Sequence, residues 1–285
     1  MSSPFRRRLR MGLQTLLGPT VGLRRQGFFI PYRYADTVAA AQPVYAALEQ
    51  RFAAAAGQMR AVLAAADGFA GDLARIAEAK APPPAPRFTQ SWFPTLDAVT
   101  AYTLVRRHGP RRIVEVGSGH STRFLSRAVA DAGRGTEITA IDPAPRASLA
   151  GLPVRFVPAV MQTADPAVFA ALQPGDVLFI DSSHILMPGT DVDWLFNRIL
   201  PALPAGVLVH VHDIFLPDDY PADWAWRGYN EQQVLGPMLA GGWDILFASH
   251  YAATRLAADV AGSIAGRLPV SPEARPASLW LRRTA

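Results

Sequence analysis

Acidic and imidazole side chains gather where two apolar runs of the sequence end. The segment DSSH occupies positions 181–184 after one run, and HVHD occupies positions 210–213 at the close of another. Side chains of these two types can bind a divalent cation or move a proton. A carboxylate that ends a buried strand needs a partner or a ligand, which favours a functional role for Asp181. These two segments are the first candidates for a reactive site.

Two chemistries fit these segments. In one, Asp181, His212 and Asp213 hold a divalent cation that lowers the pKa of a substrate hydroxyl. An imidazole beside two carboxylates suits Mn, Fe or Zn better than Mg. In the other, His184 or His212 acts as a general base without a metal, and catalysis by proximity alone is a third option. His210 lies in the apolar run on the same side as His212, and we expect it to be a core histidine.

A glycine turn forms the second group of candidates. The sequence EVGSGHST at positions 115–122 places two glycines directly after an apolar run. Glycine lets the backbone turn tightly and approach a ligand with no Cβ in the way. Asp142 ends the next apolar run, where its carboxylate can accept hydrogen bonds from both hydroxyls of an adenosine ribose. The residues expected to hold a nucleoside cofactor are Glu115, Gly117, Ser118, Gly119, Ser121, Asp142 and Asp181.

Dinucleotide-binding folds share this layout, and two residues separate the alternatives. The dinucleotide fingerprint requires glycine or alanine at its third glycine position, where this chain has Thr122. Glu115 would face a pyrophosphate unfavourably, whereas a carboxylate suits a cationic ligand such as S-adenosylmethionine. The pattern therefore favours a methyl donor over a nicotinamide dinucleotide.

The elements that must position these residues alternate along the chain. Short β-rich runs and helical stretches follow one another, which predicts βαβ units and a mostly parallel sheet with helices on both faces. Strands are expected at 113–116, 137–142, 154–157, 176–181, 206–211, 243–250 and 278–282, and helices at 122–131, 168–172, 191–200 and 230–239. Two amphipathic helices are expected between 37 and 80. The proline-rich stretch 81–86 predicts a stiff linker, so we expect a helical extension over 1–86 and a cofactor-binding domain over 87–285.

Several of these motifs resemble those of a known family. The glycine turn and the segment IDP at 141–143 resemble motifs I and II of class I S-adenosylmethionine-dependent methyltransferases. The stretches GDVLFIDSSH (175–184) and GVLVHVHDIFLP (206–217) closely resemble one bacterial subgroup, and the similarity extends from about position 92 to position 281. The resemblance implies an α/β, Rossmann-like sheet of seven strands, the last antiparallel, and S-adenosylmethionine as cofactor.

The reactive segments are also similar to those of metal-dependent sugar and antibiotic O-methyltransferases. Those enzymes carry an acid after strand four and an acidic pair after strand five, whereas this chain has His212 in place of one acid. The resemblance predicts O-methylation of a hydroxylated small molecule, such as a sugar or a secondary metabolite. N-methylation is the enzymatic alternative, to which an acid-rich site is less suited, because an amine needs no cation to activate it.

The segment that follows Asp213 is rich in aromatic residues and proline. Such a segment beyond a strand end is typical of a lid that excludes water and shapes an acceptor pocket, although a packed loop is the plainer interpretation. Tyr220, Trp224 and Asn230 are the expected contacts to the acceptor.

Composition and charge limit the remaining classes. The chain of 285 residues has no cysteine, which excludes disulfides and thiolate metal sites, and a formal net charge of +5. A non-catalytic module that binds nucleic acid or a membrane surface through its basic N-terminus is the alternative to an enzyme. It is disfavoured because the arginines stop near position 25 while the aromatic residues look core-like, so we expect no nucleic-acid partner. The arginines are Arg6, Arg7, Arg8, Arg10, Arg24 and Arg25, and the aromatic residues are Phe28, Phe29, Tyr32 and Tyr34.

The N-terminal region also bears on location and assembly. No apolar run reaches the roughly 18–20 residues of a membrane-spanning helix, and the N-terminus lacks the continuous apolar stretch of a secretory signal. We therefore expect a cytoplasmic protein. The N-terminal helices could cover the acceptor pocket or join two copies of the chain as a homodimer, and the sequence does not choose between these roles.

Overall fold

The computed structural model describes residues 4–20, 28, 32–39, 42–79 and 81–285. The chain forms two compact units, one from residues 1–43 with 221–228 and one from residues 44–220 with 229–285. The second unit contains the sheet and every candidate site residue except Trp224.

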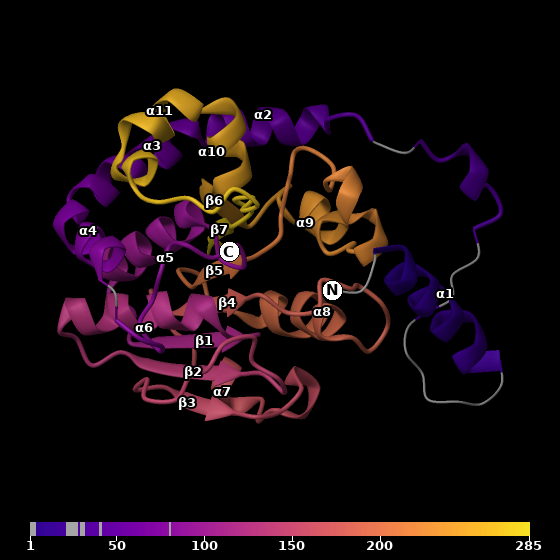
Figure 1. Cartoon of the computed structure of the whole chain (residues 1–285), viewed down its shortest axis with the longest axis horizontal. Coiled ribbons are helices and arrows are strands. Elements are labelled where there is room, and N and C mark those ends of the chain that lie inside the picture. Colours follow the sequence, from indigo (N-terminus) through magenta and orange to yellow (C-terminus); the bar gives the residue numbers. More distant parts are fainter. Residues whose placement is uncertain (1–3, 21–27, 29–31, 40–41, 80) are drawn as a thin grey trace. The chain divides into compact units, whose positions relative to one another are not determined.

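A seven-stranded sheet forms the centre of the second unit. Its strands follow the order β3-β2-β1-β4-β5-β7-β6, from bottom to top in Figure 1. The five strands from β3 to β5 are parallel to one another, and β7 runs antiparallel to both of its neighbours. The expected α/β, Rossmann-like sheet with an antiparallel last strand is thereby confirmed. The strands are β1 (Arg112–Val116), β2 (Glu137–Ile141), β3 (Arg155–Val157), β4 (Val177–Ile180), β5 (Leu208–Val211), β6 (Trp243–Ala248) and β7 (Leu279–Arg283).

The helices differ from expectation mainly before the sheet and after β6. Three helices, not two, lie between 37 and 80, and four others (α1, α5, α10 and α11) were not predicted. The expected helix over 191–200 is α-helical only in α8 and continues as the π-helix η3 (Leu195–Ile199) and the 3-10 turn η4 (Leu200–Ala202). The α-helices are α1 (Pro4–Thr20), α2 (Ala46–Ala54), α3 (Ala56–Asp67), α4 (Ala70–Glu78), α5 (Thr95–His108), α6 (His120–Ala132), α7 (Ala167–Ala170), α8 (Asp191–Trp194), α9 (Gln232–Met238), α10 (Ser249–Arg255) and α11 (Ala257–Gly262).

The way in which an element is buried explains whether its sequence pattern predicted it. All four residues of β4 are buried, as in a central parallel strand, and they form the continuous apolar run from which the strand was predicted. Every residue of α5 from Thr95 to Val105 is buried. A helix that is covered on all sides has no polar face, so its sequence lacks the amphipathic period by which helices are found.

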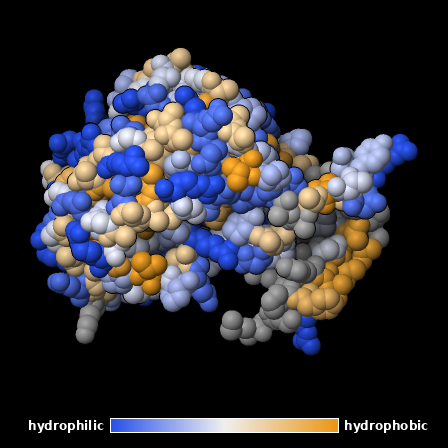
Figure 2. Space-filling view, turned by 90° about the horizontal axis from the view of Figure 1, so that it is seen from above, coloured by the Kyte–Doolittle hydropathy of each residue, from blue (hydrophilic) through white to orange (hydrophobic). Residues whose placement is uncertain are grey.

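The N-terminal region belongs to the first unit and departs from expectation. Phe28, Tyr32 and Tyr34 are 40% to 59% exposed, so the expectation that these aromatic residues belong to a core was wrong for these three. Phe29, Arg24 and Arg25 lie outside the described residues. Helix α1 is exposed as well, and its apolar side chains form an orange band at the right of Figure 2. The predicted homodimer stays a prediction.

Helices α2–α4 share one core with the sheet. Phe52, Met59 and Leu73 are fully buried in it together with residues of the strands. The compact units divide at residue 43, so the helices before the proline-rich linker lie in the same unit as the sheet. The domain boundary expected at residue 86 stays a prediction.

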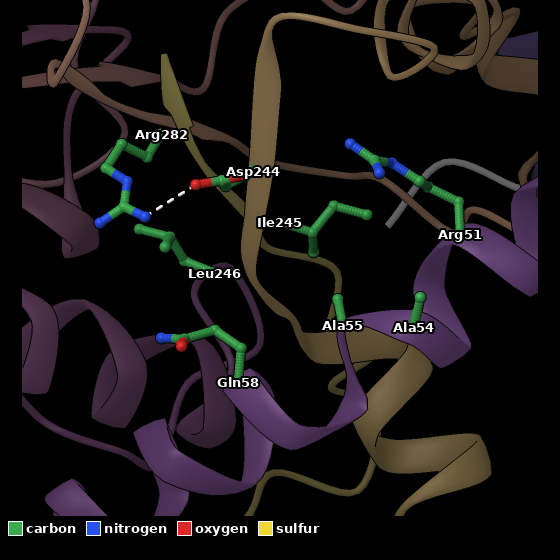
Figure 3. Close-up of a pocket in the computed structure, with 8 residues that line it drawn as sticks. All are labelled: Arg51, Ala54, Ala55, Gln58, Asp244, Ile245, Leu246 and Arg282. Atoms are coloured by element: carbon green, nitrogen blue, oxygen red, sulfur yellow. Dashed lines mark hydrogen bonds and ion pairs between the residues drawn. The ribbon is translucent and has the colours of Figure 1, made fainter. Parts of the chain in front are cut away.

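The edge strand β6 is partly covered by α2. Arg51 donates a hydrogen bond to the main-chain oxygen of Trp243 at 2.8 Å, which satisfies an acceptor at an otherwise open strand edge. A cavity lies beside this contact. In Figure 3 its walls are side chains of α2 and α3 on one side and of β6 on the other, with the Asp244–Arg282 ion pair (2.7 Å) at one end. None of the candidate site residues lines it.

Candidate functional site

The glycine turn lies at the carboxyl end of β1 and touches the end of the neighbouring strand. Gly117 has a φ of +80°, and a Cβ built on it would lie 1.8 Å from the main-chain oxygen of Asp181. Only glycine permits both this φ and this close approach. The N–H of Gly117 also donates to the carbonyl of Ile141 at 2.9 Å. The turn is therefore joined to both β2 and β4, and it places the cofactor candidates beside Asp181.

Glu115 precedes the turn and is fully buried. Its two carboxylate oxygens accept hydrogen bonds from the hydroxyls of Ser121 and Thr122, each at 2.6 Å. Burial raises the pKa of Glu115 to about 8, against the opposing effect of those two hydrogen bonds. The side chain thus anchors the first turn of α6. The predicted contacts of Glu115 and Ser121 with a cofactor stay predictions.

Asp142 fixes the other side of the turn. Its Oδ2 accepts hydrogen bonds from the N–H and the hydroxyl of Ser118, at 2.7 and 3.1 Å, and its Oδ1 accepts one from the N–H of Ala144 at 2.7 Å. The N–H of Gly119 donates to the hydroxyl of Thr122 at 2.9 Å. The carboxyl ends of β1 and β2 are thereby joined through the turn. The predicted contact of Asp142 with a ribose stays a prediction.

The two reactive segments meet as one group. Nε2 of His184 lies 3.4 Å from Oδ1 of Asp181 and 3.4 Å from Oδ2 of Asp213. Nδ1 of His212 lies 3.5 Å from the same Asp181 oxygen and 3.4 Å from Oδ1 of Asp213. We call these four residues the polar cluster. They follow β4 and β5. Strand β4 is the direct neighbour of β1, and β5 lies one strand further.

Two carboxylates that were not predicted from the sequence contact the two imidazoles. Each lies against the ring nitrogen that does not face Asp181 and Asp213. Oε2 of Glu231 lies 2.8 Å from Nδ1 of His184, and Oδ2 of Asp97 lies 3.3 Å from Nε2 of His212. Both acids are fully buried. A carboxylate in this position fixes the orientation and tautomer of an imidazole, as it does beside metal-binding histidines. Glu231 could have been noticed beside the predicted lid, but Asp97 lies on the unpredicted α5.

Backbone strain marks the same group. Among the residues that the structure describes, His184 (φ +61°) and Asp213 (φ +56°) are the non-glycine residues with a positive φ. The left-handed conformation costs a residue with a Cβ about 1–2 kcal/mol. Strain of this kind gathers at functional sites, where the surrounding structure must maintain it. It falls here on two of the four residues of the polar cluster.

The charges of the polar cluster support one another. Burial alone would lower the pKa values of His184 and His212, but the carboxylates around them hold both well above the usual value. Burial would likewise raise the pKa of Asp181, but the two histidines outweigh it and hold that pKa well below its usual range. These interactions favour the protonated form of both imidazoles and the ionised form of Asp181. Among the residues that the structure describes, no group of three or more acidic or imidazole side chains has the arrangement of a metal site.

The other two histidines near the strand ends are not part of this group. His210 is fully buried, stacks on Phe179 with ring centroids 3.6 Å apart and places Nε2 2.8 Å from the hydroxyl of Ser278. Burial lowers its pKa well below the usual value, so it is a neutral core histidine, as expected. Burial also lowers the pKa of His120 to about 4, which keeps this imidazole uncharged at the start of α6.

The three residues that are expected to contact the acceptor have different neighbours in the structure. The side-chain amide of Asn230 accepts a hydrogen bond from the N–H of Leu186 (2.6 Å) and donates to its carbonyl (3.2 Å), so it holds the loop after His184. Tyr220 packs edge-on against Tyr229, whose ring lies 4.6 Å from that of His184. Trp224 belongs to the first unit, in the 3-10 helix η5 (Ala222–Arg227). Contact of Tyr220, Trp224 and Asn230 with an acceptor stays a prediction.

Comparison with known proteins agrees with this geometry. Residues 114–214 match the model of a family described as a methyltransferase domain, a span that begins in β1 and ends just beyond the polar cluster. No curated protein matches the chain. The family match covers both the glycine turn and the four clustered side chains.

Three solved structures illustrate the likeness of fold. An O-methyltransferase from Bacillus cereus with S-adenosylhomocysteine has 13% identity over 79% of this chain and 91% of its own, with a TM-score of 0.41. The O-methyltransferase TomG from Streptomyces achromogenes, with S-adenosylmethionine, has 15% identity over 79% and 90%, with a TM-score of 0.39. The protein cmcI, with Mg and S-adenosylmethionine, has 15% identity over 75% and 84%, also with a TM-score of 0.39.

Proposed function

We propose that this chain, whose residues 114–214 match a methyltransferase domain, is an S-adenosylmethionine-dependent enzyme that methylates oxygen on a hydroxylated small molecule at the polar cluster. The observation that carries the proposal is the contact between Gly117 and Asp181. The turn that would hold the methyl donor rests on the main chain of the first residue of the polar cluster. A cofactor bound at the turn therefore has the acids and imidazoles as its neighbours.

Methyl transfer is an in-line displacement, for which the enzyme mainly aligns the reactants and keeps the accepting atom unprotonated. A hydroxyl oxygen loses its proton readily only where positive charge stabilises the anion. The polar cluster supplies such charge on His184 and His212. Asp213 would accept the proton of the acceptor hydroxyl as the methyl group passes to the oxygen and S-adenosylhomocysteine leaves. An amine acceptor needs no such charge, which makes N-methylation the weaker candidate.

The side chains of the polar cluster are of the types that bind divalent cations. Two imidazole nitrogens and two carboxylates face one another, and each imidazole has its other nitrogen held by a buried carboxylate, the arrangement found around metal-binding histidines. We propose that Asp181, His184, His212 and Asp213 hold the ion, with Mn, Fe or Zn favoured over Mg by the imidazoles. The sequence had suggested three of these four ligands. Such an ion would lower the pKa of the acceptor hydroxyl.

Elemental analysis tests the metal. The purified wild-type protein is expected to carry close to one equivalent of a transition metal, and Asp213→Asn is expected to lose at least about 90% of it, since losing one ligand typically costs more than the 10–100-fold seen for outer partners. Asparagine keeps the size of aspartate and tolerates the positive φ at this position. Equal, substoichiometric metal in both proteins would leave imidazolium chemistry as the mechanism.

Calorimetry tests the cofactor. Wild-type protein is expected to bind S-adenosylhomocysteine, and Asp142→Asn is expected to weaken that binding about 10–100-fold, because a charge-assisted hydrogen bond to a ribose hydroxyl contributes about 1.5–3 kcal/mol. Asp142→Asn should retain metal while Asp213→Asn retains S-adenosylhomocysteine binding, so each variant is the control for the other. A wild-type protein that binds a nicotinamide dinucleotide instead would refute the proposed cofactor.

A further inference from the structure

Helix α1 carries an exposed apolar stripe that the proposed function does not use. Its apolar side chains recur every three or four residues, which places them along one side of the helix. They are 48% to 71% exposed, and the orange band of Figure 2 lies over this helix. An exposed apolar patch of this kind marks an interaction surface. The α1 stripe consists of Phe5, Leu9, Leu13, Leu16 and Leu17.

The charge of α1 is entirely positive. Its 17 residues, PFRRRLRMGLQTLLGPT, include four arginines and no acid. The whole chain has a net charge of +5, so most of its excess positive charge lies in this single helix. The side chains of Arg6 and Arg10 are exposed beside the stripe. An amphipathic helix with one apolar face and a basic polar face is suited to bind a surface that has an anionic outer layer and an apolar interior.

We propose that α1 binds the surface of an anionic lipid bilayer and lies in its interface, with the α1 stripe turned towards the acyl chains. The arginines would then contact the phosphate layer, where each adds electrostatic attraction. None of the helices in the described part of the chain is long and apolar enough to cross a membrane. An amphipathic helix of this kind lies in the plane of the interface and binds the surface reversibly.

Two other occupants account for fewer of these observations. A second copy of α1 could cover the apolar stripe, but it would leave the arginines of both copies without an anionic partner. A nucleic acid would neutralise the arginines but would leave five apolar side chains in water. An anionic bilayer satisfies both the stripe and the charge.

Sedimentation with vesicles tests the proposal on the full chain. The protein is expected to bind vesicles that contain phosphatidylglycerol and to bind pure phosphatidylcholine vesicles far more weakly, with added salt weakening the anionic binding. The double variant Leu9→Ser/Leu13→Ser should lower binding at least about tenfold, and Arg6→Gln or Arg10→Gln about fivefold each. A matched control is Val160→Ser/Val270→Ser, which alters exposed apolar residues outside α1 and should bind like the wild type.

All of these variants should bind S-adenosylhomocysteine as the wild type does. Equal binding would show that the variants are folded, and it keeps the test of membrane binding independent of the test of the proposed enzyme. Three results would overturn the proposal. One is failure of the wild type to sediment with anionic vesicles, and another is binding of the leucine variant equal to that of the wild type. A dimer that the leucine variant dissociates, in a protein that ignores vesicles, would assign the stripe to a second copy instead.

Discussion

Methyl transfer by a His184→Asn variant is expected to fall about 10²–10⁴-fold, the range that a positioned acid–base or charged group contributes. Nε2 of His184 lies 3.4 Å from both Asp181 and Asp213, so the proposal places this imidazole beside the acceptor oxygen, as a metal ligand or as an imidazolium. Asparagine removes the imidazole but tolerates the positive φ at this position, so the backbone need not rearrange. The measurement is turnover of S-adenosylmethionine with the best acceptor from a panel of sugars and hydroxylated aromatic compounds.

Two controls separate chemistry from folding in this experiment. The variant should bind S-adenosylhomocysteine within about threefold of the wild type, because the glycine turn does not include His184. His108→Ala, at the far end of α5, removes a histidine outside the polar cluster and should keep full activity. Undiminished turnover in His184→Asn would move the reaction away from the polar cluster and refute the proposed site.

Gly117→Ala is expected to abolish cofactor binding and to lower the free energy of unfolding by about 3 kcal/mol or more. This loss of stability combines the cost of overpacking with the cost of a positive φ for a residue with a Cβ. The new Cβ would lie 1.8 Å from the main-chain oxygen of Asp181, and backbone at the end of a central strand cannot move aside cheaply. Displacement of Asp181 would also disturb the polar cluster. Urea unfolding and calorimetry with S-adenosylhomocysteine measure the two effects.

Gly133→Ala is the matched control for this substitution. Gly133 also has a positive φ, of +62°, but a Cβ there would meet no atom within 4 Å. Alanine should therefore cost only the conformational strain, about 1–2 kcal/mol, and leave cofactor binding unchanged. If both variants lost equal stability and both still bound the cofactor, the close approach of Gly117 to Asp181 would have no functional importance.

The sequence by itself determined the sheet and the position of its reactive end. Central strands such as β4 are continuous apolar runs between turn residues, and this local pattern identifies them without tertiary information. Because the carboxyl ends of parallel strands meet at one edge, Gly117, Asp142, Asp181 and His212 could be assigned to one site from their places after successive runs. Their convergence is a consequence of topology, which the βαβ alternation encodes.

Only the tertiary structure decided what surrounds those residues. Asp97 reaches His212 from a helix that is buried on every side, and Glu231 reaches His184 from 47 residues away along the chain. Neither contact has a periodic signal, because pairing between distant segments depends on how elements pack. The left-handed backbone at His184 and Asp213 is likewise maintained by tertiary contacts against local preference, so no propensity of the sequence predicts it.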